Sequence, residues 1–180
     1  MSSILGIELS AREEFMVKVL VHREFLDCER IKSLHQFVGD KKVFELCQHN
    51  KIGSIAADAL ARCYGWEKLA SHWQQVYEDV NVQIGQYMVE LEKAATLLAS
   101  HDIPLIALKN SGITKILYPH YGACPMGDLD VLVVSSKDSK IKKLIKKWEK
   151  RKWWIETVNQ GSKKVTALVR LDKTSPVRQL

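Results

Sequence analysis

The chain has 180 residues, of which 46% are apolar and 27% are charged, the balance of a globular protein with one domain or two small ones. No stretch approaches the roughly 20 apolar residues of a membrane span, and charges interrupt the N-terminal segment where a signal peptide needs an apolar core. We therefore expect a cytoplasmic protein with no membrane partner. The net charge of +6 points to a polyanionic partner without identifying one.

The cysteines and histidines carry no metal-binding spacing. Cys28, Cys47, Cys63 and Cys124 include no Cys-x-x-Cys pair, and the six histidines form no His-Glu-x-x-His motif. We therefore expect no zinc site and, in a reducing compartment, no disulfide framework. The first three cysteines fall in segments of helical pattern and are expected to be small core residues.

Hydrophobic periodicity predicts helices over the first hundred residues. Ser10 and Glu13 have the spacing of a capping box at the start of one helix. Another helix is expected to open at Gly53 and to close at Gly65. The longest, over 71–100, carries an apolar stripe that we interpret as core contacts.

The pattern changes after residue 100. We expect, in chain order, a buried strand over 103–108, a helix over 111–118, a loop over 119–126, a strand over 128–134, a helix over 135–152, and strands over 153–158 and 165–171 joined by a hairpin turn. The sequence therefore predicts an α+β fold, with a helical region over 1–100 and an α/β core over 101–180. Because residues 177–180 resemble the start of a further strand, we expect that this core could be truncated at its C-terminus.

Two carboxylates stand at the head of an apolar strand in the segment Gly127-Asp128-Leu129-Asp130. Residues i and i+2 of a strand point to the same face, with α-carbons roughly 6.5–7 Å apart. This spacing suits a hard, oxygen-preferring cation such as Mg²⁺ and does not suit burial without a partner. The simpler interpretation is a turn that leads into a strand.

Three segments together resemble a known family. They are the strand and lysine of residues 103–109, the dipeptide Tyr118-Pro119, and the block over 122–133. This pattern is similar to the uncharacterised nucleotidyltransferase family within the DNA polymerase β-like superfamily. The resemblance covers roughly residues 40–150 and implies a mixed β-sheet flanked by helices. It also implies an enzyme that transfers a nucleoside monophosphate from a nucleoside triphosphate, with ATP as the first choice, to an acceptor.

The resemblance assigns roles to individual residues. It implies that Asp128 and Asp130 are catalytic and hold Mg²⁺ or Mn²⁺. A turn at the end of the first strand is expected to bind the triphosphate of the nucleotide through Lys109, Asn110, Ser111 and Gly112. RNA, a protein side chain and a small molecule all remain open as acceptors.

The chain also departs from the family pattern. Asn110 replaces the glycine that follows the strand-ending lysine, and Cys124 replaces an arginine. The third metal-binding carboxylate of the superfamily is not evident. Asp172 is one choice, and a position beyond Leu180 is another.

These departures support an alternative, a catalytically weak or inactive module that binds nucleic acid or an acidic partner. Its binding surface would be the predicted helix over 137–152, where nine basic residues accompany only two acidic ones. A solvated helix face explains the same charges, and the periodic apolar stripe of this segment favours that simpler interpretation. The sequence does not indicate the oligomeric state.

Overall fold

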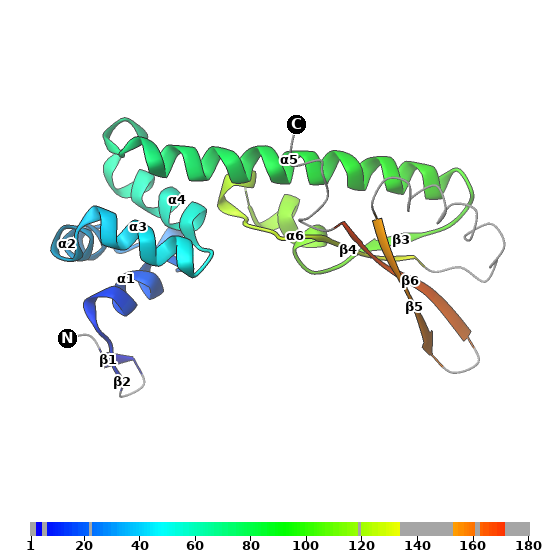
Figure 1. The fold of residues 1–180 in the computed structure, drawn as a ribbon, viewed down its shortest axis with the longest axis horizontal. Helices are drawn as coiled ribbons and strands as arrows, with labels where there is room; N and C mark the ends of the chain where they lie inside the picture. The colour runs from blue at the N-terminus through cyan, green and yellow to red at the C-terminus, as the bar shows by residue number, and fades with distance from the viewer. Residues whose placement is uncertain are drawn as a thin grey trace. The chain divides into compact units, whose positions relative to one another are not determined.

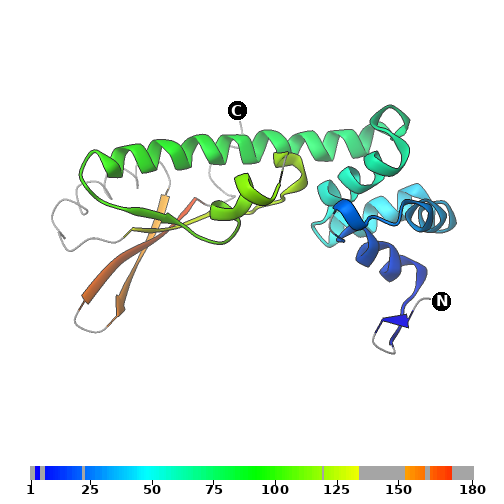
Figure 2. The ribbon, with the colours of Figure 1, turned by 180° about the vertical axis from the view of Figure 1, so that it is seen from behind.

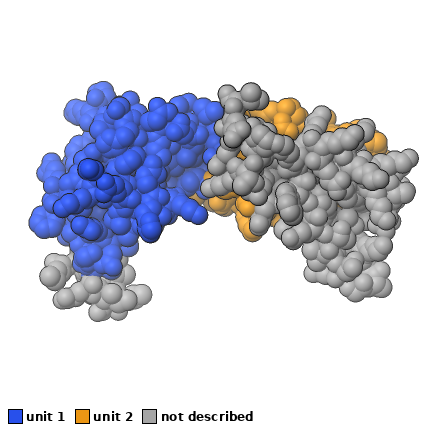
Figure 3. Space-filling model, in the orientation of Figure 1, with its two compact units in different colours: residues 1–83, 120–125 blue, residues 84–119, 126–180 orange. Residues whose placement is uncertain are grey.

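The computed structural model describes residues 3–4, 7–21, 23–118, 120–133, 153–160 and 163–171 (Figure 1). It confirms the α+β class. The chain divides into two compact units (Figure 3). Unit 1 contains Met1–Gln83 and His120–Pro125, and unit 2 contains Ile84–Pro119 and Met126–Leu180. The sequence predicted a division into a helical region over 1–100 and an α/β core over 101–180. That division into domains stays a prediction.

Unit 1 is helical apart from a two-stranded antiparallel hairpin, β1 (Ser3–Ile4) and β2 (Ile7–Glu8). The capping box predicted at its first helix is confirmed, because Ser10 N donates to Glu13 Oε2 at 2.9 Å and Glu13 N donates to Ser10 Oγ at 3.4 Å. Its helices are α1 (Ala11–Val19), η1 (Arg23–Phe25), α2 (Cys28–Val38), α3 (Asp40–His49), α4 (Gly53–Tyr64), η2 (Trp66–Lys68), the first part of α5 (Ser71–Ala99), and η3 (Tyr121–Ala123).

The core of unit 1 is built from apolar residues of the α-helices α1 to α5. Phe15 of α1, Ile31 of α2, Val43 of α3, Leu60 of α4 and Trp73 of α5 are all fully buried. Such buried positions are what the 3.6-residue periodicity of the sequence predicts. Helical packing in this unit therefore follows directly from the hydrophobic pattern.

The cysteines of unit 1 correct one prediction. Cys28 and Cys63 form a disulfide, with their α-carbons 5.0 Å apart, where no disulfide framework was expected. Motif spacing could not reveal this pair, because 35 residues separate the two cysteines and the packing of α2 on α4 brings them together. Cys47 is a free, buried cysteine as predicted, and burial raises the pKa of its thiol to about 12.

Unit 2 contains a four-stranded sheet in the order β3-β4-β6-β5. Its elements after α5 are β3 (Leu105–Ala107), α6 (Lys109–Leu117), β4 (Leu129–Val133), β5 (Trp153–Gln160) and β6 (Lys163–Leu171). All three pairings between these described strands are antiparallel, whereas the resemblance implied a mixed sheet. For the pair of β3 and β4, the reason is that α6 and the loop after it reverse the chain, so that β4 runs beside β3 in the opposite direction. Figure 2 shows β5 and β6 as the long hairpin that the sequence predicted.

Several predicted elements of unit 2 shift or fall outside the described residues. The strand expected over 103–108 is three residues long, and its central Ile106 is exposed rather than buried. The helix expected over 111–118 begins two residues earlier, at Lys109. The helix expected over 135–152 lies outside the described residues. Within the described part of the chain, no helix has the length and apolarity needed to cross a membrane.

Candidate active site

The strand β4 and the residue before it carry the two predicted metal ligands. Asp130 is the second residue of β4, and Asp128 lies one residue before its first residue, Leu129. Asp130 is 2% exposed, whereas Asp128 is only partly buried. Leu129 and Val131, which point to the opposite face of β4 from Asp130, are also fully buried, so β4 is covered on both faces. A carboxylate in such a strand requires compensating contacts.

The side chain of Lys109 supplies one of these contacts. Its Nζ forms an ion pair with Asp130 Oδ2, while the lysine side chain as a whole is 69% exposed. The ammonium therefore reaches a buried carboxylate from a position that is otherwise open to water. Sequence reasoning placed both residues in the site but assigned Lys109 to the triphosphate, and it did not predict this contact.

The main chain of Asp130 is held by the start of α6. Leu108 N donates to Asp130 O at 2.9 Å, and Asp130 N donates to Ser111 Oγ at 2.9 Å. These two bonds join β4 to residues on either side of Lys109. They hold the first turn of α6 beside the carboxylate-bearing strand.

The four predicted nucleotide-binding residues, Lys109 to Gly112, form this first turn of α6. Lys109 has a φ of +49°, a left-handed conformation that is uncommon for any residue other than glycine. Ser111 is buried, and its hydroxyl also donates to Met126 Sδ at 3.8 Å. The first turn of a helix carries N–H groups that no helical carbonyl can accept, and these are suited to an anion.

Gly112 has a packing role in this turn. A Cβ atom built on Gly112 would lie 2.7 Å from the carbonyl oxygen of Ala107 in β3, which is closer than such atoms approach. Only glycine lets α6 pack this tightly on the strand that precedes it. The sequence placed Gly112 in the predicted turn but did not reveal this close approach.

Two residues that sequence reasoning did not assign to the site contact or form the segment just before Asp128. The hydroxyl of Tyr87 in α5 donates to Gly127 O at 3.1 Å, and Met126 is buried against Ser111. Tyr87 lies 40 residues before Gly127 and was predicted only as part of an apolar stripe. Nothing in a single sequence links two positions so far apart.

Other predicted site features give no further ligand. Cys124, at the position of the family arginine, is buried and belongs to unit 1. The α-carbon of Asp130 pairs across the sheet with that of Arg170 in β6, a strand without an acidic residue. Within the described ranges, no three histidine, cysteine or acidic residues group in a way that could hold a metal. Asp172 and the basic segment 137–152 lie outside those ranges.

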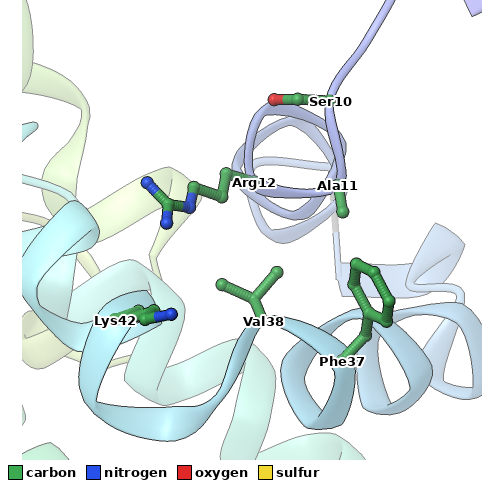
Figure 4. A pocket seen from close by; sticks show the side chains of 6 residues that line it. All are labelled: Ser10, Ala11, Arg12, Phe37, Val38 and Lys42. Carbon is green, nitrogen blue, oxygen red and sulfur yellow. The ribbon is translucent and has the colours of Figure 1, made fainter.

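A separate pocket lies in unit 1 (Figure 4). It has a volume of about 450 Å³ and combines two cationic side chains with apolar ones; its lining residues are Ser10, Ala11, Arg12, Phe37, Val38 and Lys42. Val38 points into the space between Arg12 and Lys42 (Figure 4). No predicted site residue lines it, so the chemistry of the candidate site rests on β4 and α6.

A comparison with protein families identifies the chain. A model of the uncharacterised nucleotidyltransferase family matches residues 38–148, more than half of the sequence. The chain belongs to this family. The matched region of the chain contains Asp128, Asp130 and the whole of α6, and membership supports nucleotidyl transfer from a nucleoside triphosphate as the general reaction. Comparisons with curated proteins and with solved structures find no match.

Proposed function

We propose that this chain is a divalent-metal-dependent nucleotidyltransferase that transfers a nucleoside monophosphate to an acceptor, with ATP as the first nucleotide to test. The observation that carries the proposal is the buried Asp130, which contacts a cation at the first turn of α6. In this proposal Asp128 and Asp130 bind Mg²⁺ or Mn²⁺. The triphosphate lies at the first turn of α6, near Lys109, Asn110, Ser111 and Gly112.

The residues present fit a divalent cation. Carboxylate oxygens are the ligands that Mg²⁺ and Mn²⁺ prefer, and Asp128 and Asp130 are separated by one residue. The contact between Asp130 and the Lys109 ammonium supports the fit, since a positive charge already lies against this carboxylate and a metal would compete for the same place. A bound metal would neutralise phosphate charge and polarise the attacking oxygen.

The reaction requires positioning more than covalent chemistry from the protein. The acceptor oxygen bonds to the α-phosphorus, the bond from that phosphorus to the bridging oxygen of the β-phosphate breaks, and pyrophosphate leaves while the acceptor proton passes to solvent. We assign the first-turn N–H groups of α6 and the Lys109 ammonium to the departing phosphates. Tyr87, Met126 and the Ser111 hydroxyl fix the backbone around the two carboxylates.

The test is label transfer from each of the four nucleoside triphosphates, labelled at the α-phosphate, with Mg²⁺ or Mn²⁺ and with RNA, protein and small-molecule acceptors. We expect Asp128→Asn and Asp130→Asn each to lower transfer on the order of 1000-fold, because each removes a charged metal ligand. Asp102→Asn is the matched control, an exposed aspartate of unit 2 outside the site. Transfer that survives the double substitution would contradict the site assignment.

A second function, nucleic-acid binding without catalysis, is favoured by the net charge of +6. It predicts RNA binding that weakens steeply with salt and does not change in the Asp128→Asn/Asp130→Asn double variant. A fluorescence anisotropy titration with a single-stranded RNA at several salt concentrations separates the two functions. Such binding in a protein that transfers no label with any acceptor would favour the second.

A further inference from the structure

The carboxylate of Asp130 is already paired with a cation that the chain itself supplies. The carboxylate is almost completely buried, and the ammonium that pairs with it belongs to a side chain that is mostly exposed. Lys109 therefore compensates a charge that would be costly to bury alone. The same oxygen, Asp130 Oδ2, belongs to the carboxylate that the proposed function assigns to a metal.

The backbone of Lys109 is held by its neighbours, while most of its side chain is exposed. Leu108 and Ser111, on either side of it, are bonded to the main chain of Asp130. Lys109 itself takes up a left-handed conformation, which costs free energy in a residue with a Cβ atom and persists only where neighbouring contacts impose it. In contrast, a lysine ammonium is a point charge on a flexible stem and can change partner without any backbone movement.

We propose that Lys109 is a built-in counter-ion that occupies Asp130 until a nucleotide arrives with its metal. The ammonium then moves to the triphosphate, and the metal takes its place at the carboxylate. This inference rests on the proposed function and adds an order of binding to it. Two cations at one carboxylate oxygen repel each other, so Lys109 opposes binding of the bare metal. It favours binding of the nucleotide, because the triphosphate offers the ammonium a new partner.

If Lys109 is such a counter-ion, its removal should change the affinities for the bare metal and for the metal–nucleotide complex in opposite directions. In Lys109→Met we expect Mn²⁺ alone to bind about tenfold more tightly, because its competitor is gone. We expect the Mn²⁺ complex of α,β-methylene ATP, which cannot transfer its nucleotidyl group, to bind about tenfold more weakly, because the triphosphate has lost a cation. A metal ligand or a purely structural residue would change both affinities in the same direction.

The experiment measures free Mn²⁺ by electron paramagnetic resonance and analogue binding by calorimetry, on the full chain. Lys109→Gln is a second variant in case Lys109→Met does not fold, and circular dichroism checks both. Lys109→Arg keeps the charge and is expected to bind Mn²⁺ as weakly as the wild type. Lys115→Met, at an exposed lysine of the same helix, is the matched control and is expected to change neither affinity.

The outcomes separate this inference from the proposed function. If Mn²⁺ binds the folded Lys109→Met and Lys109→Gln variants no more tightly than the wild type, the counter-ion is overturned, while analogue binding that depends on Asp128 and Asp130 still supports the proposed function. If Mn²⁺ or its analogue complex binds equally well to Asp128→Asn/Asp130→Asn, the proposed metal site itself fails and the inference fails with it.

Discussion

Each unit contains a buried carboxylate paired with a cation, and the two pairs are built differently. In unit 1, Arg30 Nε donates to Glu14 Oε1 at 2.7 Å and Arg30 Nη2 donates to Glu14 Oε2 at 2.5 Å. In unit 2, the Lys109 ammonium makes a point contact with Asp130 Oδ2. The carboxylate side chains are 3% and 2% exposed, whereas those of Arg30 and Lys109 are 38% and 69% exposed.

The difference separates a structural pair from one suited to exchange. A bidentate guanidinium holds a carboxylate through two directed hydrogen bonds, and these join α1 to α2. An ammonium makes a point contact and gives it up more readily. Burial of the carboxylate alone therefore does not distinguish a stabilising pair from a functional one. The two kinds of pair are distinguished by the geometry and exposure of the cation.

Substituting the cation of each pair should give the largest difference in thermal stability. We expect Arg30→Met to lower the Tm by about 8 °C, because it leaves Glu14 buried without its two strongest hydrogen bonds. We expect Lys109→Met to lower the Tm by about 4 °C, a smaller loss because Asp130 loses one contact where Glu14 loses two and because the ammonium leaves a position that is open to water. Thermal unfolding followed by circular dichroism measures both.

Lys32→Met is the control for this comparison, because Lys32 pairs with the exposed Glu29 within α2 and should change the Tm by about 1 °C or less. Equal losses in Arg30→Met and Lys109→Met would remove the distinction between the pairs.

A smaller loss of stability is expected from a substitution where α6 packs on β3. Gly112→Ala places a methyl group against the Ala107 carbonyl, and Ala107 cannot move freely because it pairs with Val131 of β4. We expect a loss of about 2 kcal/mol in the free energy of unfolding, measured by urea denaturation. Lys115→Ala on the exposed side of the same helix should change it by less than about 0.5 kcal/mol. A neutral Gly112→Ala would show that the close approach relaxes without cost.

The smallest loss of stability is expected from a substitution of Asp40 in unit 1, and the size of this loss depends on pH. Burial raises the pKa of Asp40, but hydrogen bonds from the Trp73 indole and from His35, with the nearby His72, lower it more, so the net pKa lies below 3.8. The stabilisation is therefore complete above pH 3.8 and is lost as the pH falls through the lowered pKa. We expect Asp40→Asn to cost about 1 kcal/mol at pH 7.

Urea denaturation of the wild type and Asp40→Asn at pH 7 and at pH 3 checks this sign. The difference between the two proteins should shrink at pH 3, where the wild-type carboxylate begins to take up a proton. A difference that grows at low pH would contradict the lowered pKa.

Local signals in the sequence predicted much of the fold. The capping box at Ser10, the helix end at Gly65 and the long helix over 71–100 all depend on residues within a few positions of one another, and the structure confirms them. The hairpin of β5 and β6 likewise follows from two apolar runs and a turn between them.

The features that local signals could not reveal all depend on distant contacts. The pairing of Cys28 with Cys63 and the hydrogen bond from Tyr87 to Gly127 require the folded arrangement of helices and loops. The spacing of the carboxylates was predicted not to suit burial without a partner. The structure buries Asp130 and pairs it with Lys109, 21 residues earlier in the chain, a partner that the sequence did not reveal. Asp128 and Asp130 stay predicted metal ligands.

The disulfide between Cys28 and Cys63 makes a closed covalent ring of the chain from α2 to α4. A single peptide bond cut anywhere inside this ring leaves both pieces in one molecule. A limited digestion that cuts the oxidised protein once, in either loop beside α3, would therefore release no fragment. Only reduction would separate the pieces, so gels run with and without reductant would report different digestion patterns for the same cuts.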